Sequence, residues 1–92
     1  SEGDIFTEPV MVNTYVKLKK YNKVIDIYKK LISKEPNNIQ YYSSLATAYL
    51  YNDDNYMAIS ELQTMKEKFP QATTQIDAAI KQIREGKFNL QK

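Results

Sequence analysis

Apolar side chains recur at intervals of three and four residues along most of the chain, with polar and charged residues between them. The clearest stretch is 22–34, whose apolar residues are Val24, Ile25, Tyr28, Leu31 and Ile32. This spacing places them on one face of an α-helix, whereas a half-buried strand would alternate apolar and polar residues. No segment shows such alternation, so the pattern predicts an all-α protein.

Five helices are predicted from this periodicity, spanning about 8–18, 22–34, 39–51, 55–69 and 73–85. Pro36 and Pro70 follow the second and fourth helices, because proline cannot continue an α-helix. The residues expected to face inward in the later helices are Tyr42, Leu45, Ala46, Tyr49, Ala58, Ile59, Leu62, Met65, Ile76, Ala79, Ile80 and Ile83.

Polar residues mark the predicted helix ends. Thr7, Asn38 and either Thr73 or Thr74 suit N-cap positions, where a side-chain oxygen accepts a hydrogen bond from a free backbone N–H group. The stretch 52–55, Asn-Asp-Asp-Asn, is typical of a turn followed by a helix cap. Gly86 suits the position just after the last helix, where the backbone turns left-handed.

The same pattern returns after 34 residues. Pro36 and Pro70 are separated by this interval, as are Tyr15 and Tyr49. A fixed period of this length indicates stacked helical hairpins, each too small to bury its apolar face alone. We therefore expect two hairpins and a capping helix.

These positions resemble the tetratricopeptide repeat, a unit of two antiparallel helices called A and B. The second unit matches most fully, with Ala46 and Ala58 at the small positions and Pro70 at the family's proline. Val12 and Ile80 depart from the pattern, since the family has a small residue where they stand. The predicted domain covers 7–86, and its parts are a repeat at 5–38, a repeat at 39–72 and a capping helix at 73–86; residues 1–6 are expected to be linker, and 87–92 a tail. The resemblance implies a right-handed stack whose A helices line a concave, partner-binding groove.

Composition restricts the chemistry. The 92 residues include no Cys and no His, which excludes disulfides, cysteine–histidine zinc sites and histidine-based triads. The net charge of +2 is too small to indicate a nucleic-acid partner, and no apolar run approaches the length of a membrane span. No nucleophile–base pair or glycine-rich phosphate loop can be assembled, and Asp53-Asp54 fits a turn better than a metal site. We expect a non-enzymatic domain without cofactor or metal.

The resemblance implies which side chains face the groove of the A helices. The candidate partner-binding residues are Asn13, Lys17, Gln40, Ser43, Thr47, Tyr51 and Lys81. The same positions of the family unit include Phe6, Pro9, Val16, Leu50 and Arg84. Short polar side chains can bond a peptide backbone, and tyrosine adds a large face with a hydroxyl group. The alternative is that these residues are simply solvated.

Two sharper functions are disfavoured by the sequence. Some members of the family hold the C-terminal carboxylate of a chaperone with a clamp of lysine, arginine and asparagine, and only Asn13 matches that clamp. Seven lysines crowd the first hairpin, which is more typical of a solvated surface than of a site for anionic lipid or RNA; they are Lys17, Lys19, Lys20, Lys23, Lys29, Lys30 and Lys34.

The predicted function is therefore protein–protein interaction, as a scaffold or assembly module within a larger bacterial protein. Two alternatives remain at this point. The open side of the first hairpin, near Phe6, Val10 and Met11, could pack on another copy. The stretch 69–87 is also similar to the endings of repeat tails on bacterial O-antigen ligase/polymerase-like membrane proteins. The expected compartment is either the cytoplasm or the soluble part of a membrane-attached protein.

Overall fold

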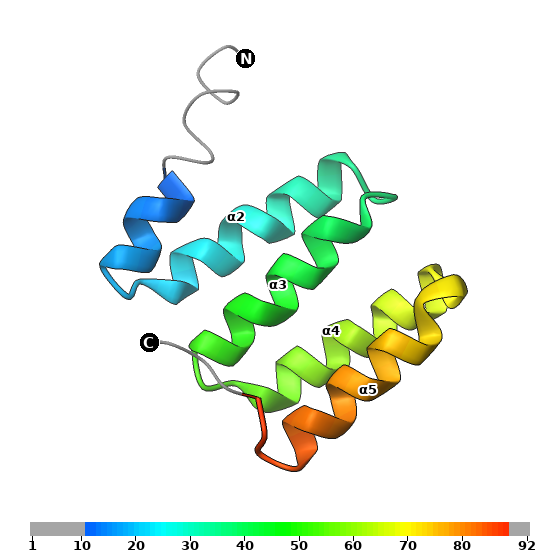
Figure 1. Cartoon of the computed structure of the whole chain (residues 1–92). Helices are drawn as coiled ribbons and strands as arrows, with labels where there is room; N and C mark the ends of the chain where they lie inside the picture. Colours follow the sequence, from blue (N-terminus) through cyan, green and yellow to red (C-terminus); the bar gives the residue numbers. More distant parts are fainter. Residues whose placement is uncertain (1–10, 89–92) are drawn as a thin grey trace.

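The computed structural model describes residues 11–88, and all regular structure in that range is helical (Figure 1). Residues 11–17 form the first helical segment. It is followed by α2 (Tyr21–Lys34), α3 (Ile39–Tyr51), α4 (Asn55–Lys68), the short 3-10 helix η1 (Pro70–Ala72) and α5 (Thr73–Arg84). The all-α prediction is confirmed for this part of the chain, and the predicted bounds of α2 to α5 are correct to within one residue.

Several expectations fall outside the described residues. These are the start of the first helix with its N-cap at Thr7, the linker at 1–6, and the contributions of Phe6, Pro9 and Val10 to a groove or a contact. The end of the tail, 89–92, lies outside them as well.

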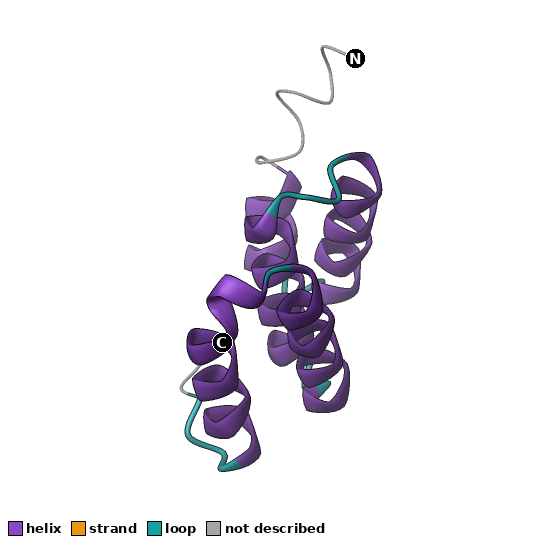
Figure 2. Ribbon diagram, turned by 90° about the vertical axis from the view of Figure 1, so that its right-hand side faces the viewer, coloured by secondary structure: helices purple, strands orange, loops and turns teal. Residues whose placement is uncertain are grey.

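Each helix packs against the helix that follows it in the chain. α2 packs on α3, α3 on α4, and α4 on α5 (Figure 1). Followed by its colours in Figure 1, the chain runs in alternating directions through these four helices, and the view turned by 90° shows the helices gathered into one stack (Figure 2). α3 therefore has a neighbouring helix on either side, and α5 forms one edge of the described stack.

The turns that close the helical hairpins have the same backbone geometry. The N–H of Lys20 donates to the carbonyl of Tyr15 at 2.8 Å, and the N–H of Asp54 donates to the carbonyl of Tyr49 at 2.9 Å. The residue before each donor has positive φ, 58° at Lys19 and 60° at Asp53. This is the Schellman motif, in which a left-handed residue lets the chain satisfy the last carbonyl groups of a helix. It recurs at Gly86, whose φ is 69°.

The connections from one hairpin to the next also repeat. Glu35 and Phe69 follow α2 and α4, and their backbone angles are nearly equal, with φ of −133° and −129° and ψ of 75° and 70°. Each donates its N–H to the carbonyl four residues earlier, at 2.8 Å. The 34-residue period of the sequence is thus also a period of the backbone.

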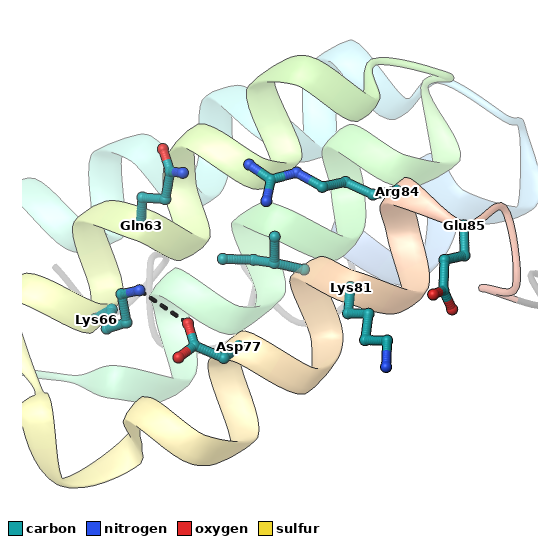
Figure 3. A pocket seen from close by; sticks show the side chains of 7 residues that line it. Gln63, Lys66, Asp77, Lys81, Arg84 and Glu85 are labelled. Carbon is teal, nitrogen blue, oxygen red and sulfur yellow. Dashed lines mark hydrogen bonds and ion pairs between the residues drawn. The ribbon is translucent and has the colours of Figure 1, made fainter.

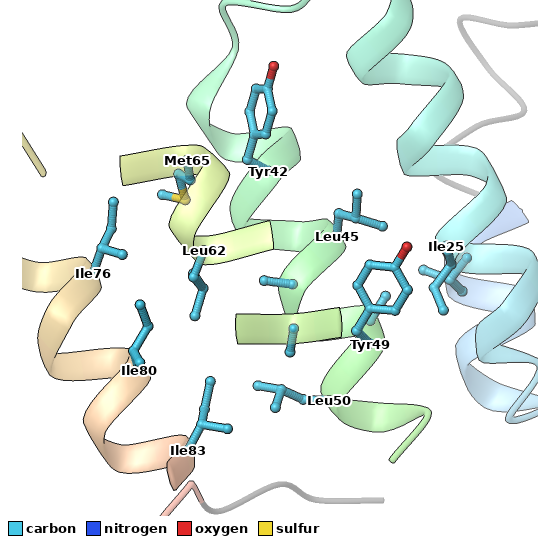
Figure 4. Close-up of a cluster of buried hydrophobic side chains, with 14 residues drawn as sticks. Ile25, Tyr42, Leu45, Tyr49, Leu50, Leu62, Met65, Ile76, Ile80 and Ile83 are labelled. Atoms are coloured by element: carbon cyan, nitrogen blue, oxygen red, sulfur yellow. The ribbon is translucent and has the colours of Figure 1, made fainter. Parts of the chain in front are cut away.

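One apolar cluster joins α2 to α5 (Figure 4). Ala58 of α4 is fully buried in this cluster. Because its side chain is small, α4 lies close to the rest of the cluster. Tyr42 packs edge-on against Phe69, with ring centroids 5.5 Å apart, and donates its hydroxyl to the carbonyl of Pro36 at 2.8 Å. Four residues predicted to face inward are only partly buried, yet all pack on the cluster: Tyr28, Ile32, Ile59 and Ala79.

Two sequence expectations are corrected. Leu50 does not line a partner-facing groove, because it is only 5% exposed and lies in the cluster beside Ile83 (Figure 4). Thr73 does not cap α5 as an N-cap acceptor. It is the first residue of that helix, and its hydroxyl donates to the carbonyl of Pro70 at 2.6 Å. The cap at Asn38 is confirmed, since its side chain accepts from the N–H of Gln40 at 3.1 Å.

Candidate functional site

Four of the predicted partner-binding residues follow one another along α3. Gln40, Ser43, Thr47 and Tyr51 are spaced by three or four residues, so they share one face of the helix. Gln40 and Ser43 are exposed, whereas Thr47 and Tyr51 are half-buried. We call these four residues the α3 strip.

The two half-buried members of the α3 strip already make contacts within the protein. The hydroxyl of Thr47 donates to the carbonyl of Ser43 at 3.0 Å, so its proton is engaged by its own helix. The ring of Tyr51 lies 5.3 Å from the ring of Tyr21, at an interplanar angle of 32°. The ring of Tyr51 is therefore held in place by its contact with α2. The exposed polar groups of the α3 strip are those of Gln40 and Ser43.

The other three predicted residues lie elsewhere. Asn13 and Lys17 are exposed and stand one turn apart on the helical segment 11–17. Lys81 is exposed on α5, where it lines a cavity with residues of α4. The sequence prediction placed all seven residues in one groove of A helices, and the structure brings Lys81 together with side chains from a helix that it had not included.

The cavity between α4 and α5 has a volume of about 390 Å³ (Figure 3). Its lining residues are Gln63, Lys66, Asp77, Ile80, Lys81, Arg84 and Glu85. A second cavity of about 390 Å³ shares Gln63 and Arg84 with the first, and its other lining residues are Tyr56, Ile59 and Ser60. The two cavities adjoin at these shared residues, and we call them together the α4/α5 groove.

Charges in the α4/α5 groove are unevenly matched. Lys66 Nζ lies 2.8 Å from Asp77 Oδ1, and Glu85 is paired with Lys87 at 3.4 Å. The side chains of Lys81 and Arg84 make no ion pair or hydrogen bond with any described residue. In Figure 3 the Arg84 side chain extends from α5 toward Gln63 of α4. The groove therefore presents two unmatched positive charges beside an apolar floor at Ile59 and Ile80.

A different face of α4 carries a half-buried carboxyl group. Burial raises the pKa of Glu61 above its ordinary value, and the positive charge of Lys29 on α2 opposes that shift. Lys29 also lies over the ring of Tyr49, with its Nζ 6.0 Å from the ring centroid. Glu61 is thus near enough to Lys29 for the lysine charge to act on its carboxyl group.

No arrangement typical of a metal site occurs among residues 11–88, where no three His, Cys, Asp or Glu side chains lie together. None of the helices in that range combines the length and apolar character needed to cross a bilayer. The seven lysines of the first hairpin are all exposed. The chain matches no protein-family model, no curated protein and no solved structure.

The α4/α5 groove was missed from the sequence because its α4 wall is not an apolar stripe. Tyr56, Ser60 and Gln63 carry no motif, and only the position of Ile59 beside Ala58 suggested an inward residue. The groove could have been found by comparing residues that stand 34 positions apart in the two repeats. Arg84 stands 34 residues after Leu50, so a cation replaces a residue of the apolar cluster.

Proposed function

We propose that this chain is a tetratricopeptide-type domain that holds another protein and performs no chemistry itself. The observation that carries the proposal is the recurrence of turn geometry, with left-handed residues at Lys19 and Asp53 and matching angles at Glu35 and Phe69. Repeats of this kind stack into extended surfaces suited to partner segments. In this proposal two hairpins and the capping helix α5 form a right-handed stack.

The proposed binding surface is the α3 strip together with Asn13 and Lys17. The exposed Gln40 and Ser43 supply hydrogen-bonding groups for a peptide backbone. The stacked pair of Tyr21 and Tyr51 supplies a large, preorganised face, and such aromatic faces contribute strongly to binding at protein interfaces. Lys81, the remaining predicted residue, lies on α5 among the residues of the α4/α5 groove.

Affinity capture with a matched pair of variants tests the proposal. Asn13→Arg/Thr47→Arg places two bulky cations on the proposed surface. Asn22→Arg/Thr64→Arg makes the same two residue changes at exposed positions on α2 and α4. Circular dichroism and thermal unfolding establish that both variants fold. Proteins captured from a native extract are identified by mass spectrometry and then remade in purified form to measure their affinity.

The expected result is a partner that binds the parent and the control variant equally. We expect the surface variant to bind it at least about tenfold more weakly, which corresponds to roughly 1.4 kcal/mol. Equal binding by all three proteins would overturn the assignment of the α3 strip. Capture of no partner by any of them would overturn the proposed function for this chain.

Self-association is a second candidate, favoured by the exposed apolar residues of the first hairpin. Met11, Val16 and Leu18 are 40%, 42% and 57% exposed, and they lie on adjoining turns of the chain. Sedimentation equilibrium of the wild type and of Val16→Lys/Leu18→Lys tests this candidate. A mass that rises with concentration in the wild type and stays monomeric in the variant would support it.

A further inference from the structure

The α4/α5 groove has a counterpart one repeat earlier. Moving back by 34 residues, Ile80 corresponds to Ala46, and Arg84 to Leu50. Both counterparts lie on α3 and are buried, at 3% and 5% exposed. The position equivalent to Gln63 is Lys29 on α2.

A helix covers that earlier counterpart. α4 packs along α3, and its Ala58 and Leu62 belong to the same apolar cluster as Ala46 and Leu50. Glu61 of α4 is close enough to Lys29 for the lysine charge to lower its pKa against the effect of burial. The face of α3 that corresponds to the α5 wall of the groove is thus covered by the amphipathic helix α4, whose Glu61 carboxylate is near the charge of Lys29.

No described residue covers the equivalent side of α4 and α5. Two cavities of about 390 Å³ each lie along it, and Tyr56 at its rim is 81% exposed. Glu35 and Phe69 have matching backbone angles, so the chain leaves α4 in the same way as it leaves α2. Ile80 lines one of these cavities and Ile59 the other, so each has an apolar residue among its walls.

The charges of the groove determine which kind of helix can bind there. Where the earlier pair has Ile32, Thr47 and Leu50, this pair has Lys66, Lys81 and Arg84, respectively. Lys66 is neutralised by Asp77, whereas Lys81 and Arg84 have no partner among the described residues. Desolvating two unmatched cations against an uncharged helix would be unfavourable, and carboxylates placed opposite them would remove that cost.

We propose that the α4/α5 groove binds an acidic amphipathic helix of a partner protein. The apolar stripe of that helix packs on Ile59 and Ile80, and its carboxylates meet Lys81 and Arg84. Tyr56 closes one rim, and tyrosine and arginine are the residue types that most often dominate interface energies. The inference rests on the proposed protein-binding function but assigns it to a surface other than the α3 strip.

Peptide display tests the inference directly. The probe is a phage library of 14-residue peptides, matching the length of α4, with leucine and alanine fixed on one helical face and the remaining positions randomised. Selection is run on the folded chain in parallel with three variants: Lys81→Glu/Arg84→Glu in the groove, Asn13→Arg/Thr47→Arg on the other proposed surface, and Lys30→Glu/Lys34→Glu as a matched charge reversal on α2. Enriched peptides are then synthesised and titrated by fluorescence anisotropy.

We expect enriched peptides to carry Asp or Glu at the flanks of the apolar face. Their affinity should fall at least about tenfold with the groove variant, stay within about twofold with the α2 control, and weaken as ionic strength rises. Peptides that lose binding only with the Asn13/Thr47 variant would overturn the inference while preserving the proposed function. No enrichment over the groove variant, or enrichment without acidic residues, would also overturn it. A dimer of the chain abolished by the groove variant would assign the groove to a second copy instead.

Discussion

At the scale of single residues, three positions within 11–88 adopt the left-handed backbone conformation, and one of these three is glycine. Gly86 was predicted for such a role from the sequence, whereas Lys19 and Asp53 were not. Aspartate tolerates positive φ better than most residues, but a lysine there pays a steric penalty of about 1 kcal/mol or more. Lys19 is therefore the least favourable local choice in the repeated turn.

Lys19→Gly is expected to stabilise the protein by about 0.5–1 kcal/mol. The variant relieves the contact between the side chain and the backbone at positive φ, and the greater flexibility of unfolded glycine offsets part of the gain. Urea unfolding followed by circular dichroism measures the change. Lys19→Ala removes the same charge but keeps the Cβ atom, so it should give no comparable gain. Equal stabilisation by both variants would assign the effect to charge.

Glu61 should make stability depend on pH. Its pKa is raised in the folded state, so the folded protein binds this proton more tightly than the unfolded chain does. Protonation therefore stabilises the fold. That contribution is complete below the unfolded value near 4.5 and is lost as pH rises through the folded-state pKa.

Glu61→Gln should consequently have a higher Tm than the wild type at about pH 7, and the difference should shrink toward about pH 4. Differential scanning calorimetry at a series of pH values measures this difference. Glu67→Gln removes an exposed carboxylate from the same helix and controls for the loss of one charge. A Tm difference that stayed constant across the series would contradict the assigned cause.

At the scale of the helices, periodicity predicted where α2 to α5 begin and end, but it did not predict which flank of α3 is covered. Leu50 was assigned to a partner-facing surface from its position in the repeat. The structure buries it in the apolar cluster to which α3, α4 and α5 all contribute (Figure 4). Val16, the equivalent residue 34 positions earlier, is 42% exposed. The same position of the repeat thus has a different role wherever a neighbouring helix covers it.

Leu50→Ala should destabilise the protein by about 2–5 kcal/mol, because it removes buried methyl groups and leaves a cavity in the cluster. Val16→Ala should cost about 0.5 kcal/mol or less, because the side chain is substantially exposed. Urea denaturation of the two variants provides the comparison. Similar losses for both would show that Leu50 is not covered in solution as it is in the structure.

At the scale of the whole molecule, α3 is the most internal element. Six of its residues are buried, compared with three each in α2, α4 and α5. Stacked repeats contact only their neighbours, so stability is expected to be highest in the middle of the described stack and lower toward its edges. Charge is also unevenly spread, since the seven lysines of the first hairpin lie at the end opposite the α4/α5 groove.

Amide hydrogen exchange should therefore be slowest in α3 and fastest in residues 11–17, with α5 intermediate. The reason is that local opening of an edge helix exposes less apolar surface than opening of α3. Exchange followed by NMR at neutral pH measures these protection factors, and Ala46 and Ala79 give a comparison of one residue type on two helices. Slower exchange in α5 than in α3 would contradict this order.

The sequence by itself determined the helices α2 to α5, their bounds, the 34-residue period and most of the apolar cluster. These features depend on residues close in the chain. The i to i+4 spacing places Leu45 and Tyr49 on one helix face, and the side chain of Asn38 caps the helix that follows it. The tertiary structure alone decided that Leu50 is buried, that Tyr51 stacks on Tyr21, and that Lys81 shares a groove with Gln63. Those outcomes depend on how far apart neighbouring helices lie and which flanks they turn toward each other. Packing between residues distant in the sequence sets those distances, and no local pattern encodes them.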